Sequence, residues 1–173
     1  MVRNASSATY RRHASAKVML IKELSVLGVE CVEPNVALKR QSITFNIFVH
    51  KWSSLQLPKE KTLNLTFRTD SRIERTGNLY FEVDHIRKGG EYDLGWLITC
   101  TADYVLYRNE RNGIDYLIDW RKTQPIVSEG LLGNLEEHVN DEDECLTRAY
   151  LVSLDELREQ NLVVEDIENH LYL

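Results

Sequence analysis

Two acidic residues, Asp70 and Glu82, are the part of the sequence whose types and spacing point most directly to chemistry. They lie twelve positions apart, each on the polar side of a segment in which apolar and polar residues alternate, the pattern of a half-buried strand. Gly77 lies between the segments, at the third place of a three-residue loop, where a hairpin prefers glycine. We therefore predict an antiparallel hairpin that sets Asp70 opposite Glu82.

Like charges that face each other across an antiparallel pair destabilise it, so something must compensate them. A divalent cation is one answer, because Mg²⁺ accepts one or two carboxylates, completes its shell with water and leaves room for phosphate oxygens. A salt-bridge ladder is the other, since Arg68 and Arg72 flank Asp70 and the same register sets Arg68 opposite Asp84. Charge-rich strand faces are common, so the residues by themselves favour the ladder.

The elements that position these acids are predicted from the same kind of pattern. Helical spacing of apolar residues indicates a first helix that ends near Gly28. A short helix capped by Asp93 follows the hairpin, and an Asn112–Gly113 turn joins the next two strands. In chain order the predicted elements are a helix over 10–27, a strand over 43–49, the hairpin, a helix over 94–101, and strands over 104–108 and 114–119.

The last third of the chain has weaker signals. Trp120 opens a helical or irregular region that Pro125 interrupts, and the acidic run 141–144 is predicted to be a loop. A strand over 149–152 precedes a final helix that a Ser153–Glu156 capping box begins. The whole order predicts a mixed α/β fold, a single domain with one central mixed sheet flanked by helices.

Length and composition restrict the class of protein to which this chain can belong. The chain has 173 residues, 43% hydrophobic and 28% charged, which fits one globular domain over residues 1–173. It has no apolar run of membrane-helix length and no apolar signal-peptide centre, so we expect a cytoplasmic location and no membrane partner. Its three cysteines have no paired spacing, so we interpret them as reduced thiols.

The charge is distributed unevenly along the chain. Residues 1–125 hold 19 Lys and Arg against 14 Asp and Glu, whereas residues 126–173 hold 2 against 13, which leaves −6 overall. A mildly basic core over about residues 10–120 is therefore followed by an acidic C-terminal section over 126–173. On the first helix, Arg11, Arg12 and Lys17 form a basic face, which is either solvated or in contact with a phosphate backbone.

This order of elements resembles the PD-(D/E)xK nuclease superfamily: a helix, an acid that ends one hairpin strand, a Glu-x-x pattern in the next strand, and a helix after it. The resemblance covers roughly residues 10–119, and the runs 95–97 (GWL) and 102–107 (ADYVLY) are similar to phage and mobile-element members. It implies a restriction-endonuclease-like core. It also implies that Asp70, Glu82 and the main-chain carbonyl of Val83 hold Mg²⁺ or Mn²⁺.

Where the motif has Lys, this chain has Asp84. The resemblance therefore implies that Lys88, or Arg87 beside it, reaches in from the following turn to supply the cation. Asp84 becomes a candidate third carboxylate ligand, and Glu23, at the end of the first helix, becomes a candidate ligand of a second metal ion. Arg87 and Arg72 are expected to contact DNA together with the basic face of the first helix.

The activity that the resemblance implies is that of a metal-dependent DNA endonuclease that processes branched, viral or mobile-element DNA, in the host cytoplasm if it is viral. The cation would stabilise charge on the phosphate and activate a water molecule, and a homodimer would match the two strands of a duplex. Two alternatives stay open. One is a catalytically inactive protein of the same fold that binds nucleic acid or protein, which the missing Lys favours. The other is a small regulator that acts through its acidic section.

Overall fold

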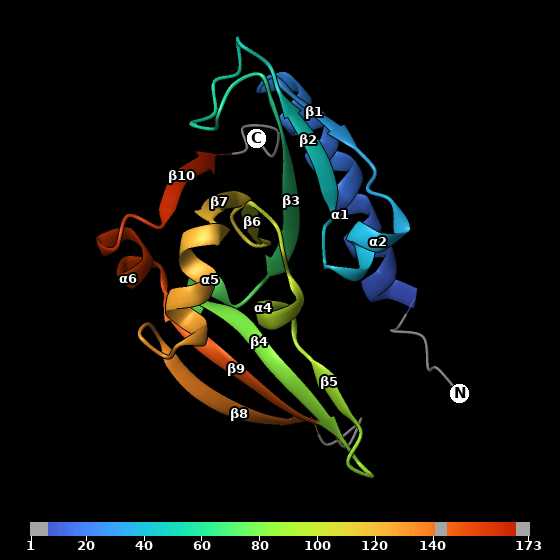
Figure 1. Cartoon of the computed structure of the whole chain (residues 1–173), viewed down its shortest axis with the longest axis vertical. Coiled ribbons are helices and arrows are strands. Elements are labelled where there is room, and N and C mark those ends of the chain that lie inside the picture. The colour runs from blue at the N-terminus through green and yellow to red at the C-terminus, as the bar shows by residue number, and fades with distance from the viewer. Residues whose placement is uncertain (1–6, 141–144, 169–173) are drawn as a thin grey trace.

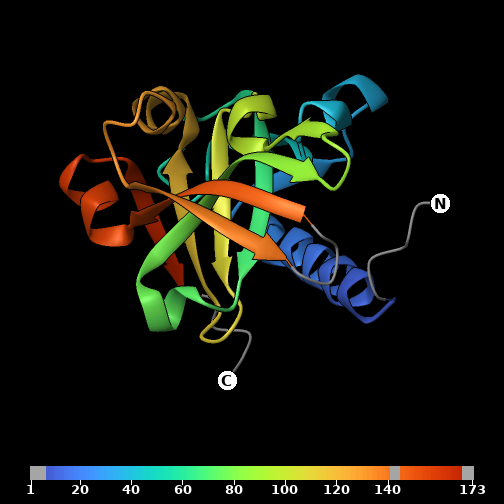
Figure 2. The same cartoon turned by 90° about the horizontal axis from the view of Figure 1, so that it is seen from below.

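Two β-sheets cross each other in this protein, and α1 covers the outer face of the larger one (Figure 1; Figure 2). The computed structural model describes residues 7–140 and 145–168. The helices within these ranges are α1 (Ser7–Val26), α2 (Val36–Arg40), α3 (Ile73–Thr76), α4 (Trp96–Thr99), α5 (Trp120–Ser128) and α6 (Leu154–Glu159). The strands are β1 (Val29–Val32), β2 (Phe45–Val49), β3 (Lys61–Asp70), β4 (Asn78–Arg87), β5 (Tyr92–Leu94), β6 (Tyr104–Asn109), β7 (Ile114–Asp119), β8 (Asn134–Asn140), β9 (Cys145–Ser153) and β10 (Val163–Glu168).

The larger sheet, called sheet A here, has the strand order β1-β2-β3-β6-β7-β10. It is mixed, because β3 and β6 run parallel while its other neighbours are antiparallel. The smaller sheet, sheet B, has the order β5-β4-β9-β8 and is antiparallel throughout. The prediction of a mixed α/β domain with a mixed sheet flanked by helices is confirmed, but the strands form two sheets rather than one.

Each face of sheet A has its own apolar core. On the outer face, Leu20 and Leu24 of α1 pack against residues of β2 and β3 such as Ile47 and Leu65. The other face meets sheet B, where the ring of Phe81 lies edge-on to the rings of Trp96 and Trp120 at 5.4 Å from each. Burial of this much aromatic surface fixes the two sheets against each other.

The predicted hairpin is wrong. β3 pairs with β2 and β6 in sheet A, whereas β4 pairs with β5 and β9 in sheet B, so Asp70 and Glu82 do not face each other as strand partners. The strand ends at Asp70 and one helical turn, α3, redirects the chain, with Ile73 buried and Gly77 in the left-handed conformation at φ 67°. Gly77 therefore ends a helix rather than a hairpin loop. Alternation predicts which side of a strand is buried, but not which strand pairs with it.

Several other elements agree with the sequence. The first helix, β2, the β6–β7 hairpin and the Ser153–Glu156 capping box are confirmed. The predicted helix over 94–101 is only Trp96–Thr99, and Gly95 precedes it, because Asp93 belongs to strand β5. Strands β1, β5, β8 and β10 were not predicted. The predicted acidic loop over 141–144 lies outside the described residues. Among those residues, no helix is both long and apolar enough to cross a membrane.

Candidate functional site

Asp70 and Arg68 lie on the face of β3 that is turned toward sheet B. Leu65 and Phe67 pack on the opposite side, in the core with α1. Successive side chains of a strand point to opposite faces, so Arg68 and Asp70 point away from α1. The guanidinium of Arg68 lies 4.7 Å from the centre of the Trp96 ring, at the core between the two sheets.

Glu82 approaches this region from sheet B. Its neighbour Phe81 is fully buried in the core, so Glu82 points to the other face of β4. The register of β4 against β9 shifts between Glu82 and Asp84, which makes Val83 the extra residue of a β-bulge. The Glu82 side chain is 31% exposed, and its Oε2 lies 3.6 Å from Nε2 of His85. Glu82 therefore stays accessible from solvent.

Tyr107 shows that the charged groups of the two sheets share one region. Its hydroxyl donates to the carbonyl of Tyr80 and accepts from the Tyr80 amide, both at 3.3 Å, and so links β6 to β4. Burial raises the pKa of this hydroxyl, Asp70 and Glu82 raise it further, and Arg68 lowers it. Arg72, which pairs with Asp70, lies 5.2 Å from the centre of the Tyr80 ring, and Glu82 follows Tyr80 by two residues on the same face of β4. The failed hairpin therefore still brings both acids near one tyrosine.

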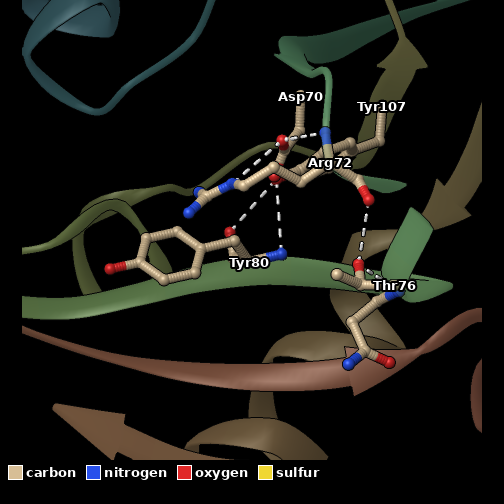
Figure 3. A network of polar contacts seen from close by, with 6 residues as sticks. Asp70, Arg72, Thr76, Tyr80 and Tyr107 are labelled. Atoms are coloured by element: carbon tan, nitrogen blue, oxygen red, sulfur yellow. Dashed lines mark hydrogen bonds and ion pairs between the residues drawn. The ribbon is translucent and has the colours of Figure 1, made fainter. Parts of the chain in front are cut away.

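Asp70 is held in place through one of its two carboxylate oxygens. Oδ1 accepts a hydrogen bond from the main-chain N–H of Arg72 at 2.7 Å and another from its Nε at 3.3 Å, as Figure 3 shows. Among the described residues, Oδ2 makes no hydrogen bond. The Arg72 side chain is 55% exposed, and such pairs contribute roughly 0–1 kcal/mol, so another cation could replace its guanidinium.

Arg68 is an incompletely paired cation on the same face of β3 as Asp70. Its Nε is buried and has no hydrogen-bond partner among the described residues. Burial lowers the pKa of the guanidinium, and the attraction of Glu82 is the largest opposing effect. A buried N–H donor without a partner is costly, so an anionic group that reached Arg68 would gain a charge-assisted hydrogen bond.

Asp84 was expected to be a third carboxylate ligand of the metal ion, but in the structure it belongs to a buried ion pair. Its side chain is fully buried, with Arg148 bonded to both carboxylate oxygens and the Tyr92 hydroxyl donating to Oδ2 at 3.0 Å. The hydrogen bonds from Arg148 hold the pKa of Asp84 below its usual value. A carboxylate that is already paired on both oxygens is a poor metal ligand, so this arrangement does not favour Asp84 as one.

Glu23 is likewise occupied, far from solvent. Arg108 lies between Glu23 and Asp115 and forms ion pairs with both, and the three side chains are at most 4% exposed. Arg108 donates to the two oxygens of Asp115 at 2.7 Å each. Within the described part of the chain, Oε1 of Glu23 has no hydrogen-bond partner. Glu23 therefore anchors α1 to β6 and β7, and this burial does not favour the expected second metal site.

The cations expected after β4 lie too far along the strand. Lys88 follows the end of β4 and is six positions after Glu82, which corresponds to roughly 20 Å at about 3.3 Å per residue of extended chain. Arg87 pairs there with Asp93 at 2.9 Å. Arg68, whose guanidinium is attracted by Glu82, is therefore a better candidate for the cation of the site than Lys88. The carbonyl of Val83, expected to be a further ligand, accepts a hydrogen bond from the Gly95 N–H at 2.7 Å.

The expected DNA-binding residues are divided between two faces. Arg72 pairs with Asp70. The ammonium of Lys17 on α1 lies instead 5.0 Å from the centre of the Phe45 ring, on the outer side of sheet A. The side chains of Arg11 and Arg12 lie outside the described ones. Among the described residues, Lys17 of the basic helix face and Asp70 therefore do not share one surface.

Sequence reasoning missed four residues of this region as site residues: Arg68, Arg75, Tyr80 and His138. Arg68 had a usable signal, because it lies two positions before Asp70 and so shares its face of the strand. His138 was missed because β8 was not predicted, although β8 pairs with β9, the next strand along the chain. Arg68 and Arg75 are near Asp70 along the chain, whereas Tyr80 and His138 come near it through the arrangement of the two sheets.

Comparisons with known proteins leave the family of this chain open. It matches no family model, and searches of curated proteins and of solved structures returned no match. Among the described residues, no group of three or more His, Cys, Asp or Glu side chains is placed to hold a metal ion. The site therefore offers two carboxylates, and the resemblance to PD-(D/E)xK nucleases rests on the sequence pattern alone.

Proposed function

We propose that this protein is a metal-dependent nuclease whose site consists of Asp70, Glu82 and Arg68. The single observation that supports this most is that Asp70 of sheet A pairs with Arg72, whose guanidinium lies over the ring of Tyr80, two residues before Glu82 in sheet B. Two carboxylates are enough for Mg²⁺ or Mn²⁺, which usually keeps several waters and accepts phosphate oxygens. The free Oδ2 of Asp70 and the partly exposed Glu82 fit that requirement.

Each residue has a role that follows from its surroundings. Asp70 and Glu82 would hold the cation, which supplies a Lewis acid and an activated water when bound. Arg68, fixed against Trp96, would donate to a phosphate oxygen as negative charge develops on it. Tyr107 positions β4 against β6 and thus sets the separation of the two acids.

Cleavage of DNA tests this proposal. Single-stranded, duplex and branched DNA are each incubated with the protein. We expect at least one of the three forms to be cut in Mg²⁺ or Mn²⁺ and left intact in EDTA. Asp70→Asn and Glu82→Gln should each reduce the rate by at least a hundredfold, since each removes a metal ligand. Arg68→Gln should reduce kcat more than it raises KM, because its bond strengthens in the transition state.

Asp93→Asn is the matched control, because Asp93 is an exposed acid that pairs with Arg87 at the far end of sheet B. Its cleavage rate should equal that of the unchanged protein. If the protein cuts none of the three DNA forms with either metal, or cuts them equally well after both Asp70→Asn and Glu82→Gln, the nuclease proposal is wrong.

Binding without cleavage is the second candidate function, and one observation favours it. The acid at the end of β3 is already in contact with Arg72, and Arg75 lies beside them with no ion pair to any described residue. Two arginines can hold phosphate without any reaction. This candidate predicts salt-sensitive DNA binding that Asp70→Asn leaves intact or strengthens, with no products. The expected DNA partner, homodimer and cytoplasmic location stay predictions.

A further inference from the structure

A small cavity opens directly beside Asp70. It has a volume of about 150 Å³ and lies between the end of β3 with α3 on one side and sheet B on the other. A cavity of about this volume in another protein holds one benzene ring, so the space matches one six-membered aromatic ring. Its lining includes Asp70, Arg72, Arg75, Tyr80, His138 and Leu151.

The lining combines positive charge with aromatic faces. Arg72 and Arg75 contribute two positive charges against the single negative charge of Asp70. The guanidinium of Arg72 lies 5.2 Å from the centre of the Tyr80 ring, and the His138 ring lies 5.5 Å from it. A planar cation thus already covers Tyr80, as Figure 3 shows for Arg72. A nucleobase can stack in the same place, since each base has a π-face and Arg72 is held only weakly.

The size of the cavity restricts which nucleic acid can use it. A paired base lies inside the duplex, stacked on its neighbours and joined to a partner, and a base pair exceeds the volume of one ring. An unpaired base can turn out of its strand and enter. Its phosphates would then lie against Arg72 and Arg75, next to Asp70.

We infer that this site acts on unpaired nucleic-acid strands, with one base seated against Tyr80 and His138. The inference rests on the proposed nuclease function for its substrate class. It adds to that function a base-binding position next to Asp70. The expected preference is for single strands, flaps or splayed junction arms over an uninterrupted duplex.

Binding measured without cleavage tests the inference separately. Fluorescence anisotropy in Ca²⁺, and again in EDTA, should show that a labelled single-stranded oligonucleotide binds at least tenfold more tightly than the blunt duplex of the same sequence. Tyr80→Leu should weaken single-strand binding by about five- to 150-fold, the range for loss of one base–aromatic stack. Tyr80→Phe should retain it, which distinguishes stacking from a misfolded variant. Arg75→Gln should make single-strand binding weaker and less dependent on salt.

Two controls match these changes in type. Trp52→Leu removes an aromatic side chain that is 66% exposed, and Arg40→Gln removes an exposed basic residue on α2. Both should bind like the unchanged protein. Equal binding of duplex and single strand, or unchanged binding by Tyr80→Leu, would overturn this inference but not the nuclease proposal. Single-strand preference without any cleavage would remove the nuclease proposal and leave the base-binding position standing.

Discussion

Replacement of Arg108 by methionine should destabilise the protein strongly, because it leaves two buried carboxylates without their cation. Glu23 and Asp115 are 4% and 1% exposed, and both pair with Arg108. Removal of one partner from a buried ionic group typically costs about 3–5 kcal/mol, against a total free energy of unfolding of roughly 5–15 kcal/mol. For a chain of this length each kcal/mol lowers Tm by about 2–4 °C, so we expect a fall of roughly 6–20 °C.

Urea and thermal unfolding followed by circular dichroism measure this effect. Methionine keeps most of the apolar stem that packs near Phe67, so the comparison isolates the charge. Lys122→Met is the control, since Lys122 is 67% exposed and its pair with Asp119 should contribute less than about 1 kcal/mol.

A triple variant tests the cause of the loss. Arg108→Met combined with Glu23→Leu and Asp115→Leu removes all three charges and should recover much of the lost stability, because apolar replacement of a buried ionic triad is often neutral or stabilising. A loss below about 1 kcal/mol for Arg108→Met alone would refute the reasoning. It would mean that the carboxylates reach water, and Glu23 would again be available to a metal ion.

Two further predictions concern the bulge and the buried pair of β4. Gly95→Ala should unfold at a lower temperature and lose cleavage. The added Cβ would lie 2.3 Å from the carbonyl oxygen of Glu82 and must displace that backbone. An unchanged Tm in differential scanning calorimetry would contradict this prediction. Asp84, whose pKa is held low by Arg148, should stabilise the fold above its unfolded pKa of about 3.9, and this stabilisation should disappear as pH falls through its lower folded value. Urea unfolding from pH 7 to pH 2 should therefore show the unchanged protein losing its advantage over Asp84→Asn in acid, and a constant difference would count against the pair.

The sequence predicted local structure better than pairing. Helical spacing and the Ser153–Glu156 box depend on neighbours along the chain, so they could be recognised from residue types alone. The partner of β3 could not be. Its alternation is compatible with any neighbour that buries the same face, and the helical turn at Ile73 has only a few residues to indicate it.

The candidate site was predicted in part for the same reason. Asp70 and Glu82 were selected for an arrangement that does not exist, yet β3 and β4 are consecutive strands, and a short connection keeps them near each other. Arg148, which occupies Asp84, comes from β9, 64 positions later in the chain. No local pattern predicts such a partner, which explains why the cation and the third ligand were assigned to other residues.

Anomalous diffraction from a crystal soaked in Mn²⁺ tests the central claim most directly. We expect one anomalous peak within coordination distance, about 2.0–2.2 Å, of carboxylate oxygens from both Asp70 and Glu82, and no such peak in Asp70→Asn crystals. A peak that contacts neither acid, or no peak at a concentration of Mn²⁺ that supports cleavage, would contradict it.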